Sequence, residues 1–409
     1  GYTMTDWGAC ADHVKGVLAG MDLSMPSLGD AADAELAQAV RDGRVPESVV
    51  DEAVKEILTI IDRYVTNHKK DPDFSLGVQH HLARKIARES AVLLKNDGAL
   101  PLKSSGRIAF IGAFAETPRY QGGGSSHINA SETTSALQAV RSVAQVRYAQ
   151  GYRTDSSVTD ATLRDEAVKL AQESDVAVVF AGLPDAFESE GFDRAHMRMP
   201  DCQNELIDAV CAVCKKVVVV LHNGAPIELP WFDRVQAVLE MYLGGQAVGG
   251  AAVDLLFGAV SPCGKLAETF PLRLEDNPSY LNFPGDGDHV RYAEELYVGY
   301  RWYDARKMSV RFPFGFGLSY TTFEYSNLRL SAEKLGADGT LEVSMDVTNT
   351  GKFGAKEIVQ LYVASAHDGV SRPVQELKGF EKVYVAPGKT ETVTMALDRR
   401  AFSYFNTDI

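Results

Sequence analysis

The chain of 409 residues has a formal net charge of -14, with 45% hydrophobic and 23% charged residues. Its length exceeds the roughly 250–300 residues at which one hydrophobic core stops growing, so two or three domains are expected. The acidic balance disfavours nucleic acids and anionic membranes as partners, because both are bound by clustered Lys and Arg. A neutral substrate such as a sugar suits this charge, and no apolar run approaches the roughly 20 residues that cross a bilayer.

Cysteine and histidine usage points away from disulfides and metals. Five cysteines, an odd and scattered number, argue against a disulfide framework, and His80-His81 and His222 have no partner at metal-ligand spacing. We therefore expect no metal and no cofactor. No signal segment opens the chain, an observation of little weight if residue 1 is not the natural start. An intracellular location is preferred to a secreted or periplasmic one, and a homo-oligomer is compatible with the sequence.

The first hundred residues predict two strand ends followed by helices. GYTMTDW alternates like a strand and ends on a carboxylate, and AGMDLSMP is a second short apolar segment that closes on a turn. From Ser48 to near Tyr64, apolar residues recur at helical spacing. The stretch HHLARKIARESAVLLKNDG then predicts a second helix over 80–95, closed by a turn at residues 96–98.

The middle of the chain predicts an α/β domain. The apolar runs IAFIGAF, VAVVFAGL, KVVVVLH and VQAVLEMYL alternate with helical segments near 160–173 and 200–214, and a further helix is expected over 246–258. Such alternation is typical of a mostly parallel sheet covered by helices.

From Thr322 the pattern changes to a two-residue period. The predicted strands are FEYSNLRLS, LEVSMDVTNTG, EIVQLYVA, FEKVYVAPG and TETVTMAL. This is a β-sandwich of the immunoglobulin or fibronectin kind, and it is incomplete because a whole one needs about seven strands.

Carboxylates follow two of the predicted strands. Asp6 and Trp7 close the first strand, where barrel enzymes place catalytic groups, and Trp7 offers an apolar face for a sugar ring; a solvated strand end is the other interpretation. The segment 188–194 (ESEGFDR) follows VAVVFAGL, in the crevice where open α/β sheets bind ligands. Crowded carboxylates raise one another's pKa, as a general acid requires, although a charged surface loop has the same composition.

A glycine-rich segment, RYQGGGSSHIN over 119–129, also follows a strand. Its three glycines let backbone amides approach a ligand closely, and its side chains supply hydrogen-bonding groups suited to hydroxyls. The phosphate-loop pattern is absent from it. GGQAVGG over 244–250 lacks the dinucleotide spacing, so a helix-packing turn is favoured there.

These segments together resemble glycoside hydrolase family 3, the β-glucosidase family. The matching stretches cover nearly the whole chain in the family's usual order: GYTMTDWGA, AGMDLSMP, ARESAVLLKNDGALPL, RYQGGGSSHIN, ESEGFDR, LHNGAPIELPW, MYLGGQAVGGAAVDLLFG, YVGYRWYD and FPFGFGLSYTTFEYSNL.

The resemblance implies an α/β fold class with a characteristic domain order. The expected parts are the end of a TIM-like (β/α)8 barrel over 1–70, a linker over 71–106, an α/β sandwich domain over 107–270, a linker over 271–321 and an incomplete fibronectin type III-like domain over 322–409. The family's first six barrel strands precede the nucleophile motif and are missing here. We therefore expect both ends to be cuts in a longer polypeptide and the isolated fragment to be inactive.

The resemblance also implies an activity, a retaining exo-β-glycosidase acting on a small-molecule or oligosaccharide β-glucoside. The nucleophile falls on Asp6, and the acid/base falls on Glu190, with Glu188 as second choice. Substrate binding is expected from Trp7, Gly123, Ser125, Ser126, His127, Asp193 and Arg194. The alternatives are a β-xylosidase or α-arabinofuranosidase of the same family, and a non-catalytic carbohydrate-binding fragment.

Overall fold

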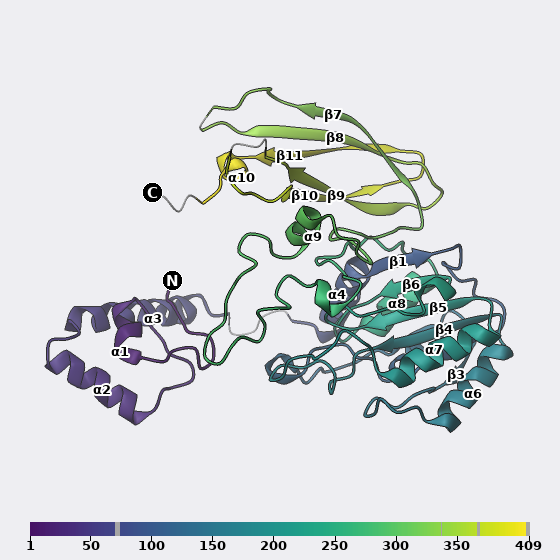
Figure 1. The fold of residues 1–409 in the computed structure, drawn as a ribbon, viewed down its shortest axis with the longest axis horizontal. Helices are drawn as coiled ribbons and strands as arrows, with labels where there is room; N and C mark the ends of the chain where they lie inside the picture. Colours follow the sequence, from purple (N-terminus) through teal and green to yellow (C-terminus); the bar gives the residue numbers. More distant parts are fainter. Residues whose placement is uncertain (70–73, 337, 366–368, 406–409) are drawn as a thin grey trace. The chain divides into compact units, whose positions relative to one another are not determined.

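The computed structural model describes residues 1–69, 74–336, 338–365 and 369–405. The chain divides into two compact units, Gly1–Phe74 and Ser75–Ile409. Each unit has a hydrophobic core of its own. Figure 1 shows the elements of both units in chain order.

The first unit packs short helices around a small core. Its helices are α1 (His13–Leu18), α2 (Asp30–Arg41) and α3 (Glu47–Asn67). Its buried core residues are Val14, Val17, Met21, Ala39 and Val45. In place of the two predicted strands, one parallel bridge joins Met4 to Leu23. α3 covers the predicted helix and extends it, and its apolar residues Val54 and Ile61 are about half exposed, at 48% and 50%. The identity of this unit as the end of a barrel stays a prediction.

The second unit contains the predicted mostly parallel sheet. The strands run in the spatial order β1-β6-β5-β4-β2-β3, and all pair in parallel except β1, which is antiparallel to β6. The strands are β1 (Val92–Asn96), β2 (Ile108–Ile111), β3 (Val146–Ala149), β4 (Val176–Gly182), β5 (Val217–His222) and β6 (Ala237–Glu240).

Helices cover both faces of this sheet. The longer ones are α4 (Leu76–Ser90), α5 (Ala136–Val140), α6 (Ala161–Gln172), α7 (Asp201–Val213) and α8 (Val248–Leu256). Short 3-10 turns are η1 (Ala113–Ala115), η2 (Gly124–Ser126), η3 (Phe232–Arg234) and η4 (Leu274–Asp276). One face packs against α6 and α7 and the other against α5 and α8. Alternate residues of β4, such as Val179 and Phe180, enter opposite cores. The central strands are therefore buried on both faces, which explains their unbroken apolar sequence.

The predicted helix over 80–95 was correct to Ser90 and wrong for residues 91–95. α4 ends at Ser90, and residues Val92–Asn96 form the antiparallel edge strand β1, with Val92 opposite Glu240. The run VLL is buried on every side, and a short apolar run of this kind fits a buried strand or a buried helix equally well by period alone. The sheet therefore begins inside the stretch that we expected to be a linker.

The C-terminal part of the second unit is a β-sandwich. Within the described residues, the predicted strands are all present as β7 (Phe323–Leu330), β8 (Leu341–Asn349), β9 (Ala355–Val363), β10 (Glu376–Val385) and β11 (Thr390–Leu397). Sheet β11-β8-β7 faces sheet β10-β9 across a core of Val347, Val359, Val385 and Val393. The short helices α9 (Tyr300–Arg306) and α10 (Arg399–Phe402) precede and follow the strands.

Partly buried ion pairs join the sandwich to the α/β domain. Lys265 Nζ lies 2.9 Å from the Glu357 carboxylate, with side chains only 15% and 8% exposed. Glu89, near the end of α4, accepts a hydrogen bond of 2.7 Å from Lys356 Nζ and lies 3.7 Å from Lys382 Nζ. Burial alone raises the pKa of Glu89, but the hydrogen bond and charge of Lys356, with the charge of Lys382, leave that pKa lowered. These pairs fix the sandwich on the end of α4.

We expect Lys265→Met to destabilise the chain by about 3 kcal/mol, because it leaves the buried Glu357 carboxylate without its cation. Urea unfolding followed by circular dichroism would show a lower transition midpoint. The matched control is Arg153→Met, which removes one partner of an exposed pair with Asp155 and should leave the midpoint almost unchanged. Equal midpoints for the two variants would show that the Lys265 pair does not secure the sandwich.

Candidate functional site

In the first unit, Asp6 and Trp7 directly follow the bridged segment. The Asp6 carboxylate accepts a hydrogen bond of 2.7 Å from the Trp7 backbone N–H, and Gly8 N–H donates to the Met25 carbonyl at 2.8 Å. Asp6 is exposed, and the Trp7 side chain is 73% exposed. The predicted carboxylate and the predicted aromatic face are thus both open to a ligand on this unit.

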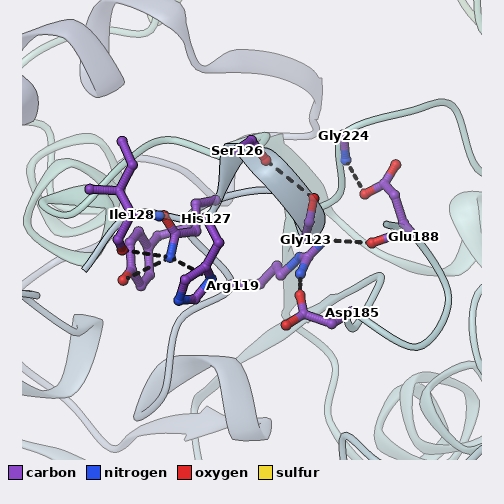
Figure 2. A network of polar contacts seen from close by, with 10 residues as sticks. Arg119, Gly123, Ser126, His127, Ile128, Asp185, Glu188 and Gly224 are labelled. Atoms are coloured by element: carbon purple, nitrogen blue, oxygen red, sulfur yellow. Dashed lines mark hydrogen bonds and ion pairs between the residues drawn. The ribbon is translucent and has the colours of Figure 1, made fainter. Parts of the chain in front are cut away.

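In the second unit, a buried arginine holds the loop that follows β4. Arg119, which is only 6% exposed, donates from Nη2 to the Glu188 carbonyl at 2.8 Å and forms an ion pair with Asp185. Figure 2 shows the guanidinium between these two partners. Burial lowers the pKa of Arg119, while the charge of Glu188 opposes that change. The arginine fixes the backbone of the predicted acidic segment just beyond the strand end.

Glycines from two other loops lie against this acidic segment. Gly224 N–H donates to Glu188 Oε2 at 2.7 Å, also drawn in Figure 2, and a Cβ at Gly224 would lie 3.1 Å from that carboxylate. Gly124 has φ +80°, and a Cβ there would come within 2.5 Å of Glu190 Cβ. A larger residue at Gly124 would be strained in its backbone and would push Glu190 away.

The two predicted segments meet at Ser125 and Glu190. Glu190 is exposed, and its Oε2 accepts hydrogen bonds from the Ser125 hydroxyl and, at 2.5 Å, from the Ser125 backbone N–H. These hydrogen bonds, the hydroxyl first, lower the pKa of Glu190. Glu188 is half-buried and points to Gly224 instead. The structure therefore gives the two candidate acids different partners, although they are only two residues apart.

The other predicted site residues have looser connections to this pair. Ser126 Oγ donates to the Gly123 carbonyl at 3.3 Å, and His127 Nδ1 lies 3.1 Å from Gln121 Nε2. Asp193 makes no hydrogen bond or ion pair with the described residues, so no contact supports an orienting role for it. Arg194 donates from Nη1 to the Pro226 carbonyl at 3.2 Å.

Sequence reasoning missed two acids beside this segment, the buried Glu240 and the half-buried Glu268. Glu240, the last residue of β6, is fully buried, and its carboxylate accepts hydrogen bonds from Asn223 Nδ2 at 3.0 Å and from Tyr242 N–H at 2.8 Å. Burial raises the pKa of Glu240 to about 8. Burial, helped by the charge of Glu188, raises the pKa of Glu268 to about 7. The sequence signal that could have indicated Glu240 is a single acidic residue at the end of the apolar run AVLE.

Neither a metal-ligand cluster nor a membrane-spanning helix is found among the described residues. No group of three or more His, Cys, Asp or Glu side chains within them is placed to hold a metal ion. None of the helices among the same residues has the length and apolar character needed to cross a bilayer.

Comparison with known proteins identifies the two domains of the second unit. Residues 91–320 match the Glycosyl hydrolase family 3 C-terminal domain, and residues 357–409 match the Fibronectin type III-like domain. The α/β fold with its mixed sheet and the fibronectin-like sandwich are therefore confirmed.

Similar proteins extend the match to the whole chain. Thermostable beta-glucosidase B of Acetivibrio thermocellus is 51% identical over 100% of this chain and 55% of its own length. An exo-alpha-(1->6)-L-arabinopyranosidase of Bifidobacterium breve is 42% identical over 99% of this chain and 55% of its own length. The crystal structure of the GH3 beta-glucosidase of Bifidobacterium adolescentis superposes with a TM-score of 0.94 and 43% identity, over 100% of this chain and 60% of that one. The chain thus spans little more than half the length of these relatives. It belongs to glycoside hydrolase family 3.

Proposed function

We propose that the complete protein containing this chain is a retaining exo-β-glycosidase that removes terminal non-reducing β-D-glucosyl residues. The observation that carries the proposal is the exposed Glu190, held by Ser125 on a loop that Arg119 anchors beyond the end of β4. Membership of the family and the names of the relatives from Acetivibrio and Bifidobacterium adolescentis support a glucoside as substrate. The chain covers only 55% of the length of the Acetivibrio enzyme. We therefore expect residues 1–409 alone to show no turnover.

The proposed mechanism is a double displacement. Asp6 attacks the anomeric carbon and forms a covalent glycosyl-Asp intermediate while Glu190 protonates the departing oxygen. Water then attacks the same carbon, Glu190 accepts its proton, and Asp6 is released with net retention of configuration. Trp7 would offer its ring to the sugar, and Gly123, Ser126, His127, Asp193 and Arg194 would bind sugar hydroxyls or orient the acid.

The same carboxyl group must be an acid in the first step and a base in the second. Ionised Asp6 near the bound sugar raises the pKa of Glu190 through like-charge repulsion, which favours the proton that the first step needs. Once Asp6 is esterified, that repulsion ends and the hydrogen bonds from Ser125 again lower the pKa of Glu190. Ser125 is thus placed to favour the basic form that activates water.

The identity of the sugar is the finer part of the proposal. The relative from Bifidobacterium breve is an exo-alpha-(1->6)-L-arabinopyranosidase, so a pentoside specificity such as β-xyloside or α-arabinoside is the rival within the family. Rates on a panel of nitrophenyl glycosides would distinguish these sugars. The alternative to a glycosidase is a carbohydrate-binding protein without catalytic activity. This alternative predicts no turnover of any nitrophenyl glycoside in the panel.

For the complete protein, we expect Asp6→Ala to abolish turnover and Glu190→Ala to lower kcat by about 10²–10⁴-fold on substrates with poor leaving groups. Azide should rescue Glu190→Ala and yield a β-glycosyl azide, because a small anion can attack the intermediate without a general base. Product analysis by NMR checks this outcome. Glu188→Ala is the matched control, and rescue of that variant by azide would move the acid/base role to Glu188.

We expect Ser125→Ala to move the alkaline limb of the kcat/KM pH profile to higher pH. The limb reports deprotonation of the general acid, and loss of the hydroxyl removes the largest influence that lowers the pKa of Glu190. Ser126→Ala is the control, because that hydroxyl donates to the Gly123 carbonyl and not to Glu190. Identical profiles for wild type and Ser125→Ala would exclude this role for Ser125.

Glu240 should make stability depend on pH. Its folded pKa of about 8 lies above its ordinary value of 4.5, so the folded chain keeps a proton that the unfolded chain has lost between these values. The unfolding free energy should therefore fall as pH rises from about 4.5 to 8, by up to about 1.4 kcal/mol per pH unit.

Glu240→Gln should flatten this dependence, because the side chain no longer ionises. Urea unfolding at pH 5 and pH 9 measures the change, with the exposed Glu324→Gln as control. Equal unfolding free energies of the wild-type chain at pH 5 and pH 9 would contradict this prediction. They would show that ionisation of Glu240 does not destabilise the folded chain.

A further inference from the structure

A cavity of about 690 Å³ lies beside the acidic segment of the second unit. Arg194 and His196 form part of its wall, Glu268 another part, and the stretch from Leu274 to Tyr303 contributes much of the rest. Its volume falls in the range of roughly 300–1,000 Å³ that small-molecule sites occupy. Arg194 is also among the residues proposed to bind sugar hydroxyls or orient the acid, whereas neither Asp6 nor Glu190 lines this cavity.

Several polar groups in the wall lack partners. Among the described residues, Arg194 Nη2, His196 Nδ1 and Glu294 Oε2 are buried without a hydrogen bond. Leaving such a group unpaired costs free energy, more for a charged group than for a neutral one. Glu294 lines the cavity, and the terminal torsion of a glutamate is soft enough for its carboxylate to adjust to a ligand there. A ligand hydroxyl that entered would therefore gain partners that the protein does not satisfy itself.

The charges of the wall favour a neutral ligand. The Glu294 carboxylate opposes an anion and the Arg194 guanidinium opposes a cation, while the raised pKa of Glu268, about 7, leaves that group only partly charged near neutral pH. The second wall arginine, Arg301, is already paired with Glu376 at 3.2 Å. A hydroxyl both donates and accepts, so one polyhydroxylated ligand serves the carboxylates and the guanidinium together.

An aromatic surface completes the wall. Tyr300 and Phe314 stack with ring centroids 4.7 Å apart. The Tyr300 hydroxyl accepts a hydrogen bond of 2.9 Å from Leu377 N–H, which fixes the ring. A rigid aromatic face beside hydrogen-bonding groups matches a sugar ring, whose C–H faces are apolar and whose edge carries hydroxyls.

We propose that this cavity is a binding site for one neutral sugar residue. The inference rests on the proposed function only in the choice of D-glucose as probe. The residue bound is either free glucose or one unit of a longer β-glucoside, because the two present the same ring and hydroxyls.

The test is the dissociation constant of D-glucose, cellobiose and D-glucuronate for the chain of residues 1–409, measured by ligand-observed NMR titration without turnover. We expect D-glucose or cellobiose to bind more tightly than the charged D-glucuronate. Comparable binding of both neutral sugars identifies a site for a free sugar, and binding of cellobiose alone identifies a site for a unit of a longer saccharide.

Variants locate the binding. Glu294→Gln should weaken it about tenfold, because a hydrogen bond to a charged group is lost. Its neighbour Glu295→Gln, which is exposed and outside the cavity wall, is the matched control and should bind normally. Ala267→Trp, a substitution at an exposed position of the rim, should block the cavity without disturbing the core.

The inference would be wrong if neither D-glucose nor cellobiose bound. It would also be wrong if they bound and neither Glu294→Gln nor Ala267→Trp weakened the binding. A third contradicting result is that D-glucuronate binds more tightly than the neutral sugars and that Glu294→Gln strengthens its binding further. Hydrolysis by the complete protein is measured separately. Failure of the glycosidase proposal with sugar binding intact, or the reverse, is therefore distinguishable.

Discussion

The buried guanidinium of Arg119 organises the candidate site. One side chain binds the Glu188 carbonyl and the Asp185 carboxylate, and so fixes a loop that no regular secondary structure stabilises. A buried guanidinium is costly unless its donors are satisfied, and here the two Nη groups have partners while Nε is buried without one among the described residues. The glycines at 124 and 224 then let two further loops close onto the fixed loop. The position of Glu190 is therefore a consequence of contacts made by the backbone around it.

The acids around this loop occupy different electrostatic environments. Glu190 is exposed and its pKa is lowered by Ser125, whereas burial raises the pKa of Glu240 and of Glu268. With pKa values of about 8 and about 7, the buried Glu240 and the half-buried Glu268 carry less negative charge near neutral pH than ordinary carboxyl groups do. Glu190, the proposed acid/base, thus lies in an environment that favours its charged form, and Glu240 and Glu268 lie in environments that favour their protonated forms. This separation of environments is what acid–base chemistry with several carboxyl groups requires.

Much of the fold was predictable from the sequence. The two-residue period identified β7 to β11, and the unbroken apolar runs identified β2, β4, β5 and β6, because each pattern reflects how many faces of a strand are buried. The parallel strand β3, which is only partly buried, was not predicted. β1 escaped prediction since a short run buried on all sides has no informative period. The sequence placed the segments 119–129 and 188–194 at strand ends. It could not show that Ser125 binds Glu190 or that Glu240 is buried, because both depend on packing between segments far apart in the chain.

The β-sandwich makes contacts close to β1, the edge strand of the six-stranded sheet. Lys356 and Lys382 bind Glu89 at the end of α4, and the next residues along the chain enter β1. Leu318 N–H donates to the Leu93 carbonyl at 2.9 Å, which ties the segment leading into the sandwich to the same strand. β1 in turn pairs with β6, and Val92 lies opposite Glu240. An edge strand paired on one side only is easily frayed, so contacts that hold β1 also hold the strand that carries the buried acid. The contacts of the fibronectin-like domain thus help to hold β1 against β6, the strand that ends on the buried Glu240.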